Sequence, residues 1–217
     1  MDKFTEFPKM ARLSREMIVT EKIDGTNAQI FIARAENPPL VPKETLFAWN
    51  DSDGKLCYML AGSRTRWITP ETDNYGFAAW AQKNAFELSK LGVGRHFGEW
   101  WGKGIQRNYG MSERRFTLFN VSRWCPHDQE PQVIPSADPT VVKRQDRLPE
   151  CCHLVPVLYW GNFDTNQINE CLTYLRDHGS QAALGFMKPE GVVAFHIAGN
   201  VGFKKTLDND NLPKSLL

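Results

Sequence analysis

The chain has 217 residues, which is enough for one large domain or for one domain with an insertion. Its 26 basic and 25 acidic residues give a formal net charge of +1, so any surface that binds nucleic acid must be local. The N-terminus has no apolar signal-peptide core, and no run of the sequence is apolar enough to span a membrane, so we expect a cytoplasmic protein with no membrane contact. Five cysteines favour packed thiols over a disulfide framework.

The first part of the chain predicts short strands joined by turns. Residues 17–34 predict two strands on either side of Asp24-Gly25, a dipeptide typical of hairpin turns, so Lys22 lies where the first strand ends. Further strands are expected over residues 37–70, with a tight turn at Asp53-Gly54.

The middle of the chain predicts a helix followed by more strands. Apolar side chains recur at helical spacing over residues 74–92, with Asp73 as a polar cap before them and Gly92 as the C-terminal cap. Residues 95–106 and 115–124 predict strands that flank a glycine-rich connection.

The last third of the chain begins with a segment of different composition. Residues 125–150 are rich in proline and charge, which indicates an exposed excursion from the core. A second helix is expected over Thr165–His178, capped by Asp164 and ended by Gly179. The final predicted element is a hairpin that turns near Gly199-Asn200.

Lys22 stands between two segments that predict buried strand, and a lysine acts as a nucleophile only when its amine is uncharged. Because an ordinary lysine has a pKa of about 10.4, reactivity needs burial or neighbouring cations, for which Arg64, Lys204 and Lys205 are candidates. Such cations would also hold a polyphosphate. The alternative interpretation is a surface lysine beside a hairpin turn.

Six short strings carry a resemblance that no single one of them would support. They are "EKIDGTN", "SRT", "FGEWWGKGIQ", "FTLFNV", "EGVV" and "FKK", in this order along the chain. In order and separation they resemble the successive motifs of the covalent nucleotidyltransferases: ATP-dependent DNA ligases, RNA ligases and mRNA capping enzymes. The first and third strings most resemble the double-strand RNA ligases typified by the second RNA ligase of a T-even phage. The likeness spans residues 20–205.

The resemblance implies an α/β (α+β) fold of mainly antiparallel sheets flanked by helices, with the nucleotide in the cleft between the sheets. We expect a single adenylyltransferase domain over residues 1–217, with an exposed insertion at residues 125–150 and no separate C-terminal domain. The implied activity is that of a monomeric ATP-dependent RNA ligase that needs Mg²⁺ or Mn²⁺. It forms a lysyl-AMP, transfers the AMP to a 5′-phosphate and seals that end to a 3′-hydroxyl, with RNA in a nicked duplex as the expected partner.

The resemblance also implies a role for each matched residue. Lys22 attacks the α-phosphate of ATP, Glu190 faces the metal, and Lys204 grips the phosphate as the third catalytic residue. Gln106 belongs to the sealing of the polynucleotide. The residues expected to bind the nucleotide are Glu21, Asp24, Gly25, Asn27, Arg64, Glu99, Phe119 and Lys205, with Glu99 on the ribose hydroxyls and Phe119 stacked on the adenine.

The chain departs from the family pattern in its final lysine pair. Family members carry two lysines separated by one residue, whereas Lys204 and Lys205 are adjacent and must point to opposite faces of a strand. We therefore expect Lys204 alone to reach the phosphate.

Two further patterns keep alternatives open. Cys125 and His127, with the Cys-Cys-His run at residues 151–153, have residue types that suit zinc but lack the spacing of zinc ribbons. The second pattern is a group of basic side chains, which predicts either a polynucleotide surface or a scattered charged face. These side chains are Lys103, Arg107, Arg114, Arg115 and Arg123.

Three alternative functions are compatible with the same motifs. They are a minimal DNA ligase, a capping-type guanylyltransferase that uses GTP, and a nucleotide- or RNA-binding protein that keeps the fold without turnover.

Overall fold

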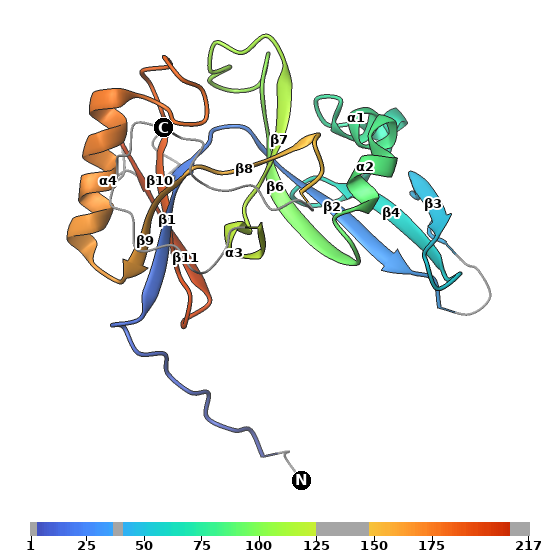
Figure 1. Cartoon of the computed structure of the whole chain (residues 1–217), viewed down its shortest axis with the longest axis horizontal. Coiled ribbons are helices and arrows are strands. Elements are labelled where there is room, and N and C mark those ends of the chain that lie inside the picture. The colour runs from blue at the N-terminus through green and yellow to red at the C-terminus, as the bar shows by residue number, and fades with distance from the viewer. Residues whose placement is uncertain (1–3, 37–40, 125–147, 209–217) are drawn as a thin grey trace.

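The structure, a computed structural model, describes residues 4–36, 41–124 and 148–208. These residues form two mainly antiparallel sheets with helices on their faces, so the expected α+β class is confirmed (Figure 1). The expected excursion at residues 125–150 lies outside the described residues, except for residues 148–150. In the described ranges no helix has the length and apolar character that crossing a membrane requires.

The smaller sheet has four strands in the order β11-β10-β1-β9. Their bounds are β1 (Glu16–Lys22), β9 (Val157–Asn162), β10 (Gly191–His196) and β11 (Val201–Thr206). Helix α4 (Thr165–His178) covers one face of this sheet, where Leu175 packs in one buried cluster with Met17 and Val192 (Figure 1). The other face of this sheet is turned toward the second sheet.

The bounds of α4 agree with the sequence prediction because both of its ends carry strong local signals. The Asp164 carboxylate accepts a hydrogen bond of 2.8 Å from the backbone N–H of Asn166, which caps the N-terminus. Gly179 follows the last helical residue with φ +80°, a conformation that glycine adopts without steric cost.

The larger sheet has seven strands in the order β3-β4-β2-β6-β7-β8, with β5 paired to β4. Their bounds are β2 (Thr26–Arg34), β3 (Phe47–Asn50), β4 (Leu56–Gly62), β5 (Trp67–Ile68), β6 (Gly94–Gly102), β7 (Arg114–Leu118) and β8 (Cys152–Leu154). Only β7 and β8 pair in parallel among these strands. The predicted turn at Asp53-Gly54 is confirmed, since β3 and β4 pair on either side of it.

The largest core cluster lies between this sheet and the helices on one of its faces. Phe77 and Leu88 pack there with Ile30 and Trp100, all almost fully buried. The helices are η1 (Pro70–Thr72), α1 (Phe77–Lys83) and α2 (Ala85–Ser89). Trp100 in this cluster and its neighbour Trp101 are both core residues, 2% and 1% exposed.

Two predicted elements differ from the structure. The single helix expected over residues 74–92 is interrupted at Asn84, whose φ of −101° and ψ of 16° are not helical. The Asn84 side chain donates a hydrogen bond of 2.8 Å to the carbonyl of Trp80, and this local bond competes with the helix. The segment expected as strand up to residue 124 instead ends in a short helix, α3 (Val121–Trp124).

The expected hairpin at Asp24-Gly25 is wrong, because β1 and β2 belong to different sheets. Residues 23–25 carry the chain from the smaller sheet to the larger one. A third buried cluster, with Ile18, Ile23 and Trp101, lies where the sheets meet. A Cβ on Gly25 would come within 2.6 Å of the Trp100 carbonyl oxygen and 2.7 Å of the Trp101 Cβ, so only glycine allows this crossing.

We predict that Gly25→Ala lowers the free energy of unfolding by about 1–3 kcal/mol, because the added methyl group overpacks the crossing against the β6 backbone. Gly202→Ala is the matched control, since its Cβ would lie 3.8 Å from the Phe195 ring and meet ordinary contacts only. Urea denaturation of both variants measures the difference. Equal effects would contradict a steric constraint at Gly25.

Candidate functional site

A cavity of about 850 Å³ opens where the two sheets face each other. Its size is in the range of small-molecule sites. The predicted site residues that line it are Glu21, Lys22, Asn27, Arg64, Glu99 and Phe119. They come from both sheets and from the connections between strands, so the fold brings together residues that are far apart in the sequence.

Lys22 forms an ion pair with Glu190 at one wall of this cavity. Its Nζ donates to Glu190 Oε2 at 2.5 Å, and the two side chains are 23% and 17% exposed. The pair follows from the strand register, because Lys22 is opposite Gly191 at the end of the β1–β10 ladder and Glu190 directly precedes Gly191. The sequence suggested cations beside Lys22; its ion-pair partner in the structure is the carboxylate of Glu190, and the suggested cation Arg64 lines the same cavity.

Glu99 is the second carboxylate near Lys22, and it is only 7% exposed. Asn27 is opposite Glu99 in the β2–β6 ladder, so its Nδ2 can donate to one carboxylate oxygen while the N–H of Gly25 donates to the other, each at 3.1 Å. Burial raises the pKa of Glu99 to about 7, although the nearby Lys22 charge and these hydrogen bonds oppose the rise. Glu99 therefore titrates close to neutral pH.

The side chain of Glu21 points away from the cavity. It is 1% exposed and accepts hydrogen bonds from the Ser180 hydroxyl at 2.6 Å and from the backbone N–H groups of Gln181 and Ala182. Burial raises the pKa of this carboxyl, and the three hydrogen bonds counteract the rise. Its side chain thus anchors the loop after α4, and only its backbone remains for a ligand in the cavity.

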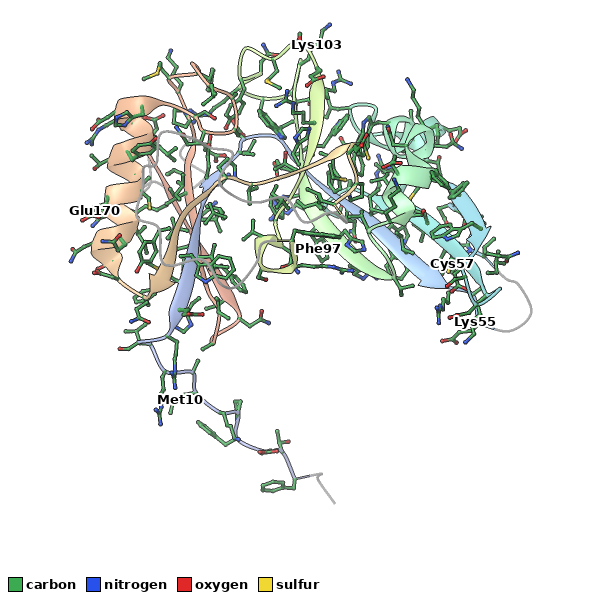
Figure 2. The ribbon with its side chains drawn as sticks, in the orientation of Figure 1. Met10, Lys55, Cys57, Phe97, Lys103 and Glu170 are labelled. Carbon is green, nitrogen blue, oxygen red and sulfur yellow. The ribbon has the colours of Figure 1, made fainter. Side chains whose placement is uncertain are left out.

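Aromatic side chains form another part of the cavity wall. Phe119 is 41% exposed, and its backbone N–H donates to the carbonyl of Phe97. The side chain of Phe97 is 51% exposed and lies between the two sheets (Figure 2). Phe195 contributes from the smaller sheet. Sequence reasoning missed Phe97 and Phe195, although Phe97 is two residues from Glu99 and alternation within a strand places both on one face.

Arg64 lies on the exposed turn between β4 and β5, beside the cavity. Gln29 supports this turn, since its Nε2 donates to the carbonyl of Ser63 at 3.4 Å. Gln29 is held in turn by Arg95, whose Nη1 donates to Gln29 Oε1 at 3.0 Å and whose guanidinium stacks 4.5 Å from the Phe31 ring centre. Exposed side chains of the larger sheet therefore hold the turn that carries Arg64.

Lys204 and Lys205 lie on opposite faces of β11, as the sequence predicts. Lys205 is opposite Val192, which packs against α4, and its Nζ donates to Asn169 on that helix at 2.7 Å. Lys204 is opposite Val193, which lines the cavity. Lys204 is thus the lysine on the cavity side, and the structure places Lys205 away from it.

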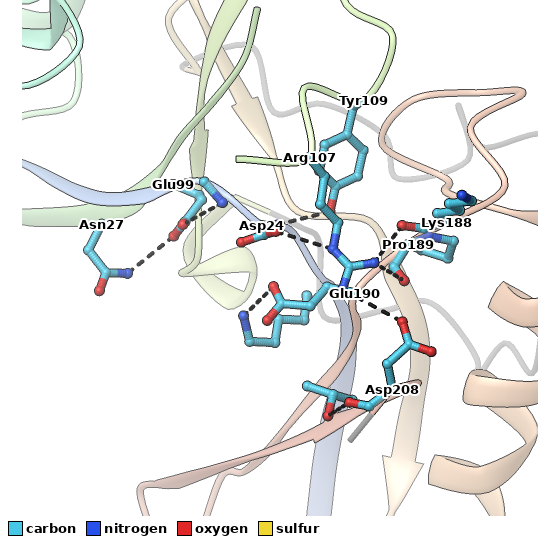
Figure 3. A network of polar contacts seen from close by, with 12 residues as sticks. Asp24, Asn27, Glu99, Arg107, Tyr109, Lys188, Pro189, Glu190 and Asp208 are labelled. Atoms are coloured by element: carbon cyan, nitrogen blue, oxygen red, sulfur yellow. Dashed lines mark hydrogen bonds and ion pairs between the residues drawn. The ribbon is translucent and has the colours of Figure 1, made fainter. Parts of the chain in front are cut away.

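Asp24 and Gln106 lie beside the cavity and do not line it. The Asp24 carboxylate accepts from Arg107 Nε at 3.2 Å, and its N–H donates to the Tyr109 hydroxyl at 2.8 Å (Figure 3). Gln106 is exposed on the same connection between β6 and β7, with φ +44°.

The expected basic surface is not formed as a cluster of unpaired side chains. Arg107 bonds Asp24, Arg114 donates to the carbonyls of Lys103 and Tyr75, and Arg123 donates to the carbonyl of Leu91. Arg115 pairs with Glu113 at 2.7 Å. These guanidinium groups hold loops in place, and Lys103 extends from the end of the connection (Figure 2).

The alternative of a metal site built from cysteines and histidines falls partly outside the described residues. Cys125 and His127 lie outside them, and no group of three metal-binding side chains is found in residues 4–36, 41–124 and 148–208. Cys152 is fully buried in the core cluster of the larger sheet. A metal ion in the cavity would therefore be bound by a carboxylate such as Glu190 together with oxygen atoms of a molecule bound in the cavity.

Comparisons with known proteins agree with this fold. A family model described as RNA ligase matches residues 15–202. Two variants of an RNA ligase from Naegleria gruberi, solved with ATP and Mn, are 19% and 18% identical to this chain, each with a TM-score of 0.51. Each match covers 90% of this chain and 51% of the other, so the chain spans about half the length of these ligases. No curated protein matches it.

We predict that the stability of the protein falls relative to Glu99→Gln as pH rises from 5 to 8. The folded state keeps a proton on Glu99 that the unfolded chain releases near its ordinary pKa of 4.5, so raising pH favours unfolding until the folded pKa of about 7 is passed. Over the whole range between the unfolded and folded pKa values, the change in the free energy of unfolding is about 3 kcal/mol. Denaturant titrations at several pH values measure it, and a difference that does not vary with pH would contradict the burial of this carboxylate.

Proposed function

The chain belongs to the RNA ligase family, and we propose that it is an ATP-dependent ligase that works through a lysyl-AMP on Lys22. The observation that carries the proposal is the ion pair between Lys22 and Glu190 at the wall of the cavity between the sheets. The side chain of Lys22 is only 23% exposed, so this pair differs from the solvent-exposed contact of an ordinary surface lysine.

The first step is the transfer of AMP from ATP to Lys22. The lone pair of Nζ forms a P–N bond to the α-phosphorus, while the bond from that phosphorus to the pyrophosphate oxygen breaks and pyrophosphate leaves. The ammonium group must first lose a proton, and Glu190 Oε2, at 2.5 Å, is placed to accept it. The pair thus supplies both the nucleophile and its base.

The cavity offers groups that fit the remaining parts of a nucleotide. The exposed rings of Phe97 and Phe119 suit a stacked adenine, and Glu99 can accept hydrogen bonds from ribose hydroxyls. Arg64 and Lys204, on opposite sides of the site, suit the phosphates. The Naegleria ligases that share the fold were solved with ATP and Mn, which supports a nucleotide and a divalent metal here.

A divalent metal fits the donor set around Lys22. Mg²⁺ in nucleotide sites is held by one or two carboxylates plus phosphate oxygens and water, and Glu190 offers such a carboxylate beside Lys22. When bound, the ion would neutralise charge on the phosphates. The role of the chain itself is to hold Lys22, Glu190 and the nucleotide in line.

The later steps use the adenylylated chain on a polynucleotide. AMP moves from Lys22 to a 5′-phosphate, and a 3′-hydroxyl then displaces it to form the phosphodiester bond. We propose RNA in a nicked duplex as the substrate, because "EKIDGTN" and "FGEWWGKGIQ" resemble the double-strand RNA ligases. Gln106, on the connection beside the site, is the proposed sealing residue. Residues 1–217 would act as one adenylylating unit.

We predict that α-labelled ATP with Mg²⁺ leaves an acid-labile label on the wild-type chain, and that Lys22→Ala abolishes it by removing the attacking amine. Lys55→Ala, a change of an exposed lysine on the distant β3–β4 turn, is the matched control and keeps the label. Gel autoradiography measures the label. A label that survives Lys22→Ala, or its absence from the wild type, would contradict the proposal, and a label from GTP alone would identify a capping-type enzyme.

We predict a larger loss of adenylylation for Lys204→Ala than for Lys205→Ala, because only Lys204 lies on the cavity face of β11. Loss of one charged contact to a phosphate lowers the rate on the order of 10- to 100-fold. Initial rates at saturating ATP compare the two variants. Equal losses, or the greater loss for Lys205→Ala, would show that the register does not decide which lysine grips the phosphate.

A further inference from the structure

Arg107 lies at the centre of a polar network beside the Lys22–Glu190 pair (Figure 3). Its Nε donates to Asp24 Oδ2 at 3.2 Å, and its Nη1 donates to the carbonyls of Lys188 and Pro189 at 3.0 and 3.4 Å. Its Nη2 lies 3.8 Å from Asp208 Oδ2. The guanidinium group thus uses several donors of one planar fork on separate segments of chain.

The segments that Arg107 joins are those that carry the reacting pair. Asp24 is two residues beyond Lys22, while Lys188 and Pro189 directly precede Glu190. The backbone ladder between β1 and β10 ends at Lys22 and Gly191. The contacts of Arg107 therefore continue the junction past the last paired residues, where two otherwise separate turns could move apart.

The connection that presents Arg107 is itself held in an unusual shape. Gln106, Asn108 and Tyr109 have φ of +44°, +59° and +49°, which residues other than glycine rarely adopt. The Asn108 side chain accepts from the N–H of Gly104 at 2.7 Å and closes the turn. Such strained backbone persists only when its surroundings determine it, and it is common at functional sites.

Tyr109 fixes the base of this connection. The ring is 3% exposed and packs against Trp101 and Phe186, with ring centres 5.0 and 4.6 Å apart. Its hydroxyl accepts from the N–H of Asp24 at 2.8 Å. Asp24 is therefore held twice, through its backbone by Tyr109 and through its carboxylate by Arg107, which makes the segment after Lys22 rigid.

We propose that Arg107 is a positioning residue that keeps Lys22 and Glu190 in their paired geometry during adenylylation. The inference rests on the proposed function, and it replaces the expectation that Arg107 contacts the polynucleotide, because its donors are used within the chain. Arginine suits the role, since lysine has no planar fork with which to bind a carboxylate and two carbonyls together. Arg107 acts on the nucleophile and its base without lining the nucleotide cavity.

The test compares Arg107→Ala, Arg107→Lys and Asp24→Asn with the wild type in single-turnover adenylylation. The matched control is Arg115→Ala, which removes an arginine that pairs with Glu113 beside the same connection. We expect the rate at saturating ATP to fall about 10- to 100-fold for Arg107→Ala, since a displacement of about 1 Å can have this effect. The KM for ATP should change less than about threefold, and Arg107→Lys should recover part of the rate.

A second measurement separates positioning from folding. Thermal unfolding gives the folded fraction, and rates are taken per folded molecule below the lowest Tm. We expect the double variant Arg107→Ala with Asp24→Asn to be no slower than the slower single variant, because both changes remove the same contact.

Three results would overturn the inference. They are an unchanged rate per folded molecule in Arg107→Ala, a higher KM with an unchanged rate, and full additivity of the two changes. Any of these with a labelled wild type leaves the proposed function intact. A wild type that takes no label overturns the proposed function and this inference with it.

Discussion

The ion pair between Lys22 and Glu190 is the interaction on which the site depends. It stands at the end of the β1–β10 ladder, where the register brings Lys22 opposite Gly191, the residue after Glu190. Both side chains are mostly removed from solvent, so the loss of either partner would leave the other charge poorly compensated. The same contact that steadies the junction also places a carboxylate against the amine.

The junction between the sheets imposes the second constraint. Gly25 lets the chain cross close to β6, and its N–H then reaches the buried carboxylate of Glu99. Glu99 is thereby held beside Lys22 in surroundings that raise its pKa toward neutrality. Backbone packing, the buried acid and the amine are therefore parts of one arrangement, since a change at the crossing would alter the hydrogen bonds to the acid.

Local patterns in the sequence predicted the elements whose signals are local. Both ends of α4 could be predicted from Asp164 and Gly179, because a cap acts within one turn of helix. The opposite directions of Lys204 and Lys205 could be predicted because side chains alternate along any strand. The motif strings also identified several residues that the fold brings to one cavity, although each string alone is weak evidence for a site.

Long-range features could not be predicted in this way. The Asp24-Gly25 pair has the composition of a hairpin turn, yet its strands join different sheets, because packing against β6 decides where the chain goes. The partner of Lys22 and the contacts of Arg107 both cross more than 80 residues of sequence. Phe97 had a usable signal in its spacing from Glu99, but nothing local distinguished it from a core residue.

In the proposed reaction, Lys22 becomes covalently linked to AMP. Peptide mapping by mass spectrometry, after incubation with ATP and Mg²⁺, tests it most directly. We expect one AMP adduct per chain, located on Lys22 and released when pyrophosphate is added. An unmodified chain, or an adduct on any other residue, would contradict it.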